Sequence, residues 1–193
     1  MDREQALENF RKLKERVDVA PFLDELEAHP AWARRSGRQK MIPVQRETQS
    51  MFLRAPTVDL LPQPLRKLLG IKVHDSHGSF WARESKKLPA LKGFLQEFAA
   101  SQGTRLGRAN VVRLKPQGKV YPHIDQGAYS RRRDRYHLVL KSEAGSVLTA
   151  GGETVVMRAG ELWWFDNKKE HSAENPSDEW RIHLIFDLDR RRR

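Results

Sequence analysis

The segment Arg181–Asp187 has the sequence RIHLIFD, in which polar and apolar residues alternate as in a half-buried β-strand. Ile182, Leu184 and Phe186 share one face, and Arg181 and His183 share the other. The segment Arg135–Lys141, with the sequence RYHLVLK, repeats the pattern and places Arg135 and His137 on its polar face. Because guanidinium and imidazole groups recur at matching positions, we expect both polar faces to line a cavity inside a barrel. The alternative is that these faces lie in water.

Further short runs of strand-forming residues surround these two segments. They are separated by turn residues, such as Gly118 after Pro116 and the pair Gly151-Gly152. The predicted strands are Glu47–Leu53, Ala109–Leu114, Val120–Asp125, Ser146–Thr149, Glu153–Met157 and Glu161–Phe165. Many short strands joined by tight turns predict an antiparallel sandwich or barrel.

Helical spacing of apolar residues predicts helices in the first half of the chain. Ala6, Phe10, Leu13 and Val17 recur at this spacing near the N-terminus, and a second short helix is expected over Pro21–Ala28. An apolar stripe predicts an amphipathic helix over Pro89–Ser101, whose stripe needs the outer face of a sheet. We therefore expect a helical extension over residues 1–40 that packs on a β domain over residues 41–189, followed by a basic tail over residues 190–193.

The chain of 193 residues carries a formal net charge of +11. Seven of its positive charges lie in Arg131–Arg133 and Arg190–Arg193, and the rest of the chain carries +4. Such runs are either solvated segments or sites that attract an acidic partner. No aromatic residue interleaves with them, so a base-stacking surface is not indicated, and nucleic acid is not the expected partner.

The chain contains no cysteine, which excludes disulfides and cysteine-based zinc sites. No apolar run approaches the length of a membrane-spanning helix, and the first residues, MDREQ, do not resemble a signal peptide. These features favour a cytoplasmic protein that does not enter the membrane.

One group of residues has the pattern of a metal site. His123 and Asp125 are two positions apart on a predicted strand, so their side chains point to the same side, and His171 follows in a later turn. Two histidines and one carboxylate form the facial triad of non-haem Fe(II) oxygenases. Arg181 lies ten positions after His171 and offers a planar fork to the far carboxylate of a keto-acid co-substrate.

Arg135 and His137 have two interpretations. They hold the metal-proximal carboxylate of the co-substrate or shape the substrate site, or else Arg135 forms a cross-strand ion pair with Asp134 or Glu153.

Several of these segments, in this order and spacing, resemble the aspartyl/asparaginyl β-hydroxylase family. They are RLKPQG at 113–118, PHID at 122–125, RYHL at 135–138, GELWWFDN at 160–167, His171 and RIHLIFD at 181–187. The resemblance implies a double-stranded β-helix, a cupin-like jelly roll that is mainly β with N-terminal and flanking helices. It also implies a dioxygenase that uses Fe(II), 2-oxoglutarate and O2 and releases succinate and CO2.

The same resemblance implies roles for single residues. His123, Asp125 and His171 would bind iron, and Arg181 would bind a carboxylate of 2-oxoglutarate. The pair Arg135 and His137 matches an Arg-x-His element that contacts the co-substrate, and His183 belongs to the same lining. The complete triad with Asp125 resembles bacterial members of the family, which include hydroxylases of small molecules such as proline.

The substrate contacts are expected near the metal. Gln49 lies on an early strand near the expected entrance of the active site. Gln126 and Arg131 belong to a segment after the metal ligands that could act as a lid. Alternate residues of Trp163–Phe165 would line the cavity, and Trp164 is the candidate. The expected substrate is an amino acid, a peptide or a protein that is acidic if the arginine run contacts it. The oligomeric state stays open.

Two other functions are compatible with parts of the sequence. A non-catalytic cupin-like module would bind nucleic acid or an acidic partner through its arginine-rich segments. A cupin isomerase or hydrolase would use another divalent metal. The non-catalytic module would not require the triad and Arg181 at this spacing, so their presence argues against it.

Overall fold

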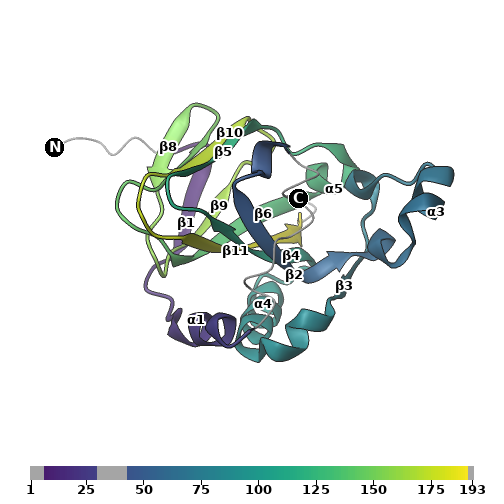
Figure 1. The fold of residues 1–193 in the computed structure, drawn as a ribbon, viewed down its shortest axis with the longest axis horizontal. Helices are drawn as coiled ribbons and strands as arrows, with labels where there is room; N and C mark the ends of the chain where they lie inside the picture. Colours follow the sequence, from purple (N-terminus) through teal and green to yellow (C-terminus); the bar gives the residue numbers. More distant parts are fainter. Residues whose placement is uncertain (1–6, 30–42, 191–193) are drawn as a thin grey trace.

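The computed structural model describes residues 7–29 and 43–190, and these residues form two antiparallel sheets (Figure 1). The larger sheet has seven strands in the order β1 (Phe10–Lys14), β9 (Leu162–Phe165), β6 (Arg133–Lys141), β11 (Arg181–Asp189), β4 (Leu106–Leu114), β2 (Thr48–Pro56) and β3 (Ser79–Trp81). The smaller sheet has the order β5 (Gly118–His123), β10 (His171–Asn175), β7 (Val147–Ala150) and β8 (Glu153–Val156).

One face of the larger sheet packs under helices. The helices α1 (Ala20–Glu27) and α4 (Pro89–Ser101) lie together on the side of this sheet away from β5 and β10 (Figure 1). Leu91 and Leu95 of α4 are fully buried in one cluster with Leu138 of β6 and Leu184 of β11. Full burial of each such side chain contributes about 1.5–3 kcal/mol. The predicted assignment of the apolar strand faces to a helix-covered core is confirmed.

The other face of the larger sheet meets the smaller sheet. Val139, Trp163 and Phe165 of the larger sheet pack against Leu148 and Ala173 of the smaller one. Residues of both sheets also line a cavity beside this cluster. Two antiparallel sheets that enclose a core and a cavity confirm the expected mainly β, jelly-roll architecture.

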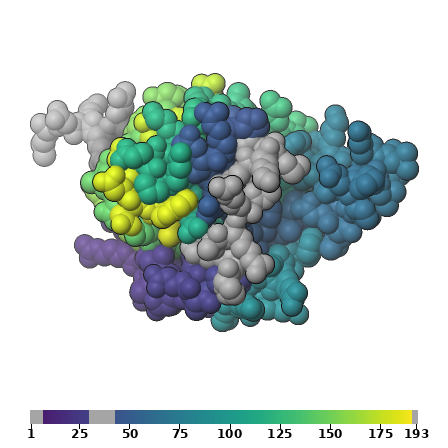
Figure 2. Space-filling model, in the orientation of Figure 1, coloured from purple at the N-terminus to yellow at the C-terminus, as the bar shows by residue number. Residues whose placement is uncertain are grey.

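Short helical segments complete the described chain. The helix α3 (Gln63–Leu68) stands out from the body of the molecule (Figures 1 and 2), and α5 (Gly127–Arg131) connects β5 to β6. Four 3-10 turns lie at η1 (Pro43–Gln45), η2 (Thr57–Leu60), η3 (Val73–Asp75) and η4 (Arg83–Lys87). The helix α5 packs against η3, so residues 127–131 form an ordered element rather than an open loop.

The helix expected over residues 6–17 is wrong, because Phe10–Lys14 is strand β1. Phe10 pairs with Phe165 of β9 and is only 2% exposed, whereas Leu13 is 44% exposed. The free edge of β9 supplies backbone partners that the local spacing does not encode. The expected helices over Pro21–Ala28 and Pro89–Ser101 are confirmed as α1 and α4.

Two other strands differ from expectation. His171 begins strand β10 and does not lie in a turn, and β3 was not predicted. Both segments are short and lack alternation of apolar residues, so their pairing in the sheets decides their conformation.

Other predictions lie outside the described residues. These are the boundary at residue 40 and the tail residues 191–193. In the described part of the chain, no helix has the length and apolar character that would let it cross a membrane.

Candidate metal centre and co-substrate pocket

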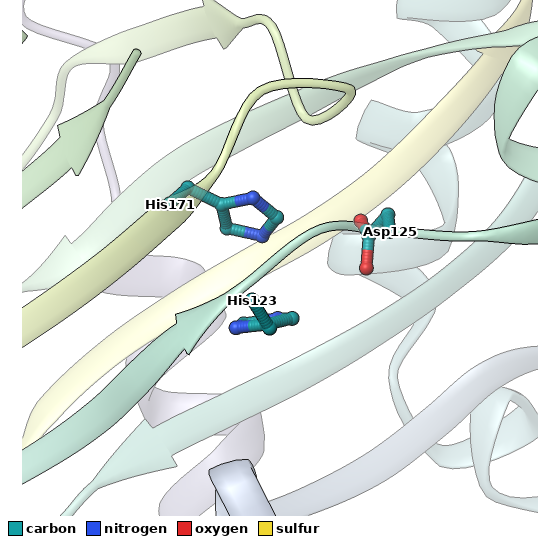
Figure 3. A group of neighbouring side chains, drawn as sticks. All are labelled: His123, Asp125 and His171. Atoms are coloured by element: carbon teal, nitrogen blue, oxygen red, sulfur yellow. The ribbon is translucent and has the colours of Figure 1, made fainter. Parts of the chain in front are cut away.

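His123, Asp125 and His171 come together where β5 and β10 meet (Figure 3). His123 ends β5 and is the register partner of His171, the first residue of β10. Asp125 follows two residues after His123, beyond the end of the strand. One ligand atom from each of the three side chains lies within 4.8 Å of the other two. The predicted triad is therefore assembled in the fold.

Both histidines are oriented by carbonyl groups behind them. The Nδ1 of His123 lies 2.8 Å from the carbonyl oxygen of Tyr121, and the Nδ1 of His171 lies 3.0 Å from that of Lys169. A carbonyl oxygen only accepts, so each Nδ1 carries the proton, and each Nε2 keeps its lone pair for a metal. Burial lowers the pKa of His171 and keeps its ring neutral.

The carboxylate of Asp125 is held in its ionised form. Burial alone would raise its pKa, but the charge of Arg135 and a hydrogen bond from Asn167 lower the pKa to about 2. The Nδ2 of Asn167 donates to Oδ2 at 2.9 Å, and Nη1 of Arg135 donates to the same oxygen. A fixed anion at this position is what a divalent metal requires.

Arg135 is itself fixed by a second carboxylate. Its Nε donates to Oδ1 of Asp187 at 2.8 Å, and its Nη2 lies 3.2 Å from Oδ2. The pKa of Arg135 is raised by Asp125 and Asp187 against the effect of burial. Arg135 thus links Asp187 to Asp125 and positions Asp125 as a metal ligand. Asp187 was not among the site residues predicted from the sequence. The alternation of Arg181, His183 and Asp187 on β11 was the signal that placed Asp187 on this face.

The ion pairs expected for Arg135 with Asp134 or Glu153 are wrong. Asp134 pairs with Lys168 and Arg190. Glu153 accepts the backbone N–H groups of Glu8 and Asn9. Asp134 alternates to the opposite face of β6 from Arg135, so it cannot reach the guanidinium of its neighbour.

A cavity of about 110 Å³ lies beside the triad. Arg181 lines it, is 5% exposed and donates from Nε to Nε2 of His183 at 3.0 Å. Its Nη2 is buried and has no hydrogen-bond partner among the described residues. Burial lowers the pKa of Arg181 to about 10, which leaves the side chain cationic at neutral pH. A buried cation with an open donor at a cavity is a site for a carboxylate.

His137 and His183 set the orientation of Arg181. The Nε2 of His183 accepts from Arg181, so its proton is on Nδ1, which lies 3.2 Å from Nδ1 of His137. His137 therefore accepts at Nδ1 and carries its own proton on Nε2. Burial, together with the charge of Arg181, lowers the pKa of both rings well below the usual value. The predicted inward position of all four residues on β6 and β11 agrees with the structure.

The four candidate substrate residues lie away from this cavity. Gln49 accepts from Nε of Arg113 at 2.6 Å on the opposite face of β2, and Trp164 faces outward, where Arg11 covers its ring. Gln126, the residue before α5, and Arg131, the last residue of α5, are exposed and do not line the cavity. Residues that the sequence analysis did not select line the cavity instead: Gln45, Thr48, Asn110 and Ile185. Thr48 directly precedes Gln49 on β2, and alternation puts Thr48 on the face of the strand that lines the cavity.

The residues of the site fit iron and a keto-acid. Two imidazoles and one carboxylate, gathered within 4.8 Å of one another, are a ligand set that suits Fe(II). The open Nη2 of Arg181 supplies the cation that a second carboxylate needs. His123, Asp125 and His171 would hold the metal, and Arg181 would hold the co-substrate.

Two curated proteins are similar to this chain in sequence. The chain is 30% identical over 105 residues to L-proline cis-4-hydroxylase of Rhizobium meliloti (strain 1021), covering 54% of this chain and 37% of that protein. It is 35% identical over 89 residues to L-proline cis-3-hydroxylase 1 of a Streptomyces species, covering 45% of this chain and 30% of that protein. The chain thus spans about a third of the length of these curated relatives.

Solved structures share the fold. A 2OG-Fe(II) oxygenase family protein of Burkholderia pseudomallei superposes with a TM-score of 0.59 and 13% identity, over 95% of this chain and 85% of that chain. A prolyl-4-hydroxylase of Pseudomonas putida gives a TM-score of 0.54 and 14% identity, over 95% and 94% of the two chains. The model of the aspartyl/asparaginyl β-hydroxylase family matches residues 73–191, more than half of the chain, and the protein therefore belongs to that family.

Proposed function

We propose that this protein is a 2-oxoglutarate-dependent dioxygenase that hydroxylates an unactivated C–H bond of an amino-acid side chain. The proposed cofactor is Fe(II), the co-substrates are 2-oxoglutarate and O2, and the co-products are succinate and CO2. The observation that carries the proposal is the assembled triad of His123, Asp125 and His171 next to the unpartnered Nη2 of Arg181.

Iron bound at the triad would supply the oxygen activation that side chains cannot perform. The residues of the chain would position the reactants. Tyr121 and Lys169 present the two imidazole lone pairs through their carbonyls, and Arg135 and Asn167 fix the carboxylate of Asp125. Arg181, oriented by His183, would bind the far carboxylate of 2-oxoglutarate. The apolar wall that includes Phe165 would limit the access of water.

The proposed substrate is an amino acid, either free or within a peptide. The names of the two curated relatives describe hydroxylation of L-proline, so proline is the first substrate to test. The small cavity favours a side chain of modest size near the metal.

The test is a turnover assay with Fe(II), 2-oxoglutarate and O2 over a panel of free amino acids and peptides. Succinate release and an oxygen-atom gain in the product, both read by mass spectrometry, are expected for at least one compound. His123→Ala should abolish turnover, while Glu143→Gln, an exposed carboxylate away from the site, should retain it. Wild-type protein that binds neither a divalent metal nor 2-oxoglutarate would contradict the proposal.

A purely non-catalytic module is not favoured. Such a module gains nothing from a buried guanidinium with an open donor at a cavity, because an unpaired buried charge destabilises the fold.

A further inference from the structure

A second concave surface lies outside the metal pocket. It has a volume of about 550 Å³ and shares no lining residue with the cavity beside the triad. Five arginines from three segments of the chain line it: Arg105, Arg131, Arg132, Arg133 and Arg190. We call this surface the arginine cleft.

Arg133 of the arginine cleft lies on the same face of the larger sheet as Arg135, which holds the metal ligand Asp125, and is two residues away along β6. Arg135 is the register partner of Asp187, and Arg133, two residues earlier on β6, is the partner of Asp189. Nη2 of Arg133 lies 2.9 Å from a carboxylate oxygen of Asp189, which repeats the pairing seen at Arg135. Helix α5, which begins two residues after Asp125, ends at the cleft with Arg131.

The backbone fixes the three segments that carry the arginines. The N–H of Asp189 donates to the carbonyl of Arg105 at 3.0 Å, and the N–H of Arg190 donates to that of Arg132 at 3.1 Å. The guanidinium of Arg133 contacts Nδ1 of His77 at 3.0 Å and stacks on the buried ring of Tyr129 at 4.2 Å. The fold thus fixes the backbone positions of the three segments and the guanidinium of Arg133 before any ligand binds.

Positive charge in the cleft exceeds what the fold neutralises. Asp189 is the one carboxylate of the lining and is shared by Arg105 and Arg133. Arg131 and Arg132 are exposed and form no ion pair or side-chain hydrogen bond within residues 7–29 and 43–190. Burial and the charges of Arg133 and Arg132 lower the pKa of His77, as expected in a strongly positive field. In the sequence, Arg191–Arg193 follow Arg190 directly.

The lining indicates the kind of ligand. It contains no aliphatic side chain and no phenylalanine, tyrosine or tryptophan, so it lacks the anchors that usually dominate the binding of a polypeptide segment. Arginine forks match the oxygens of phosphate groups, and phosphate contacts need only cations and backbone positioning. The lining has no phenylalanine, tyrosine or tryptophan on which unpaired bases could stack, and the ring of His77 contacts Arg133. A duplex needs no such stacking, because its bases stay paired.

We propose that the arginine cleft docks the phosphate backbone of a double-stranded nucleic acid, without reading its sequence. Recognition is electrostatic, so the affinity falls steeply with salt as counterions return to the duplex. About four exposed arginines in contact with phosphates give a slope of about −3.6 in a plot of log K against log salt concentration. The docking site is separate from the metal pocket and is present whatever substrate is oxidised there.

The test measures anisotropy of a fluorescein-labelled DNA duplex of about two helical turns, with the full chain, between about 50 and 200 mM NaCl. The double variant Arg131→Ala/Arg132→Ala should weaken binding on the order of tenfold and make the slope shallower by about 2. The matched control Lys86→Ala/Lys87→Ala removes the same charge from an exposed pair outside the cleft and should leave binding close to wild type. Thermal unfolding checks that both variants are folded.

Several results would overturn the proposal. These are no duplex binding by the wild type, an equal loss in both double variants, tighter binding of a single strand of the same sequence, or tighter binding of a glutamate-rich peptide than of the duplex. None of these assays needs iron or turnover, so their failure leaves the hydroxylase proposal standing, and failure of the turnover assay leaves this one standing.

Discussion

At the scale of single residues, Arg181 is oriented for a co-substrate carboxylate before the co-substrate binds. Its guanidinium is buried, oriented by His183, and left with one donor unpaired. A cation in this state destabilises the protein when no carboxylate is bound, since its lost hydration is not fully replaced. The unpaired donor lowers the stability of the fold and makes a carboxylate site available, as is common in active sites.

Arg181→Met should therefore stabilise the protein by about 1–4 kcal/mol in urea unfolding while it abolishes the binding of 2-oxoglutarate. In the wild type, 2-oxoglutarate at a hundred times its Kd should add about 2.7 kcal/mol to the free energy of unfolding, and in the variant it should add nothing. Arg158→Met, at an exposed arginine, is the control and should keep the stabilisation by 2-oxoglutarate. A variant that is still stabilised by 2-oxoglutarate would show that Arg181 does not bind it.

At the scale of elements, strand β1 gives a direct test of a conformation that the local pattern missed. Phe10 packs on the rings of Trp163 and Phe165, whose centroids lie 6.4 and 6.2 Å away, whereas Leu13 is largely exposed. In an amphipathic helix, these two residues would share the buried stripe and contribute alike.

Phe10→Ala should destabilise the protein by about 3–5 kcal/mol, because it leaves a cavity between the sheets. Leu13→Ala should change the free energy of unfolding by no more than about 0.5 kcal/mol. Chemical denaturation of both variants measures the difference, and equal losses would favour the helix over the strand.

The element α5 ties the metal ligands to the rest of the fold. Gly127, two residues after Asp125, has a φ of +92° and lies so close to His74 that an added Cβ would be 2.5 Å from its carbonyl oxygen. Gly152 has a φ of +86°, and a Cβ there would meet nothing within 4 Å. An alanine at either position would strain the backbone, but only an alanine at position 127 would also clash with a neighbour. Comparing the two substitutions therefore separates the effect of strain from the effect of the clash.

Gly127→Ala should lower the affinity for Mn(II), measured by calorimetry, on the order of tenfold or more, because the clash displaces the segment that carries Asp125. Gly152→Ala has the same strain of about 1–2 kcal/mol and should bind Mn(II) like the wild type. Equal metal affinities in both variants would mean that α5 does not position Asp125.

At the scale of the whole molecule, the polar interior makes stability depend on pH. Burial lowers the pKa of His137 and His183 well below the usual value, so the folded protein keeps them neutral while the unfolded chain protonates them near pH 6.5. Stability from these groups is complete above that pH and is lost as the pH falls below it.

These two rings should make the free energy of unfolding fall by about 2.7 kcal/mol per pH unit below about pH 6, before the carboxylates titrate. The pKa values of His77 and His171 are also lowered, so the total slope should be at least this steep. Urea unfolding between about pH 7 and pH 5 measures the slope. His183→Asn should reduce it by about 1.4 kcal/mol per pH unit, and His74→Asn, at an exposed histidine, should leave it unchanged. A flat profile in the wild type would contradict the buried, neutral state of the two rings.

The local sequence by itself determined the alternating strands, the helix over Pro89–Ser101 and the residue types of the triad, because side-chain periodicity and ligand chemistry are local properties. The tertiary structure decided that Phe10–Lys14 is a strand, since the edge of β9 provides its partners. It also decided that Asp187 fixes Arg135, that Gln49 and Trp164 face away from the cavity, and that five arginines from three segments share one cleft. These features depend on which strands pair and in which register, and contacts between residues far apart in the chain set both.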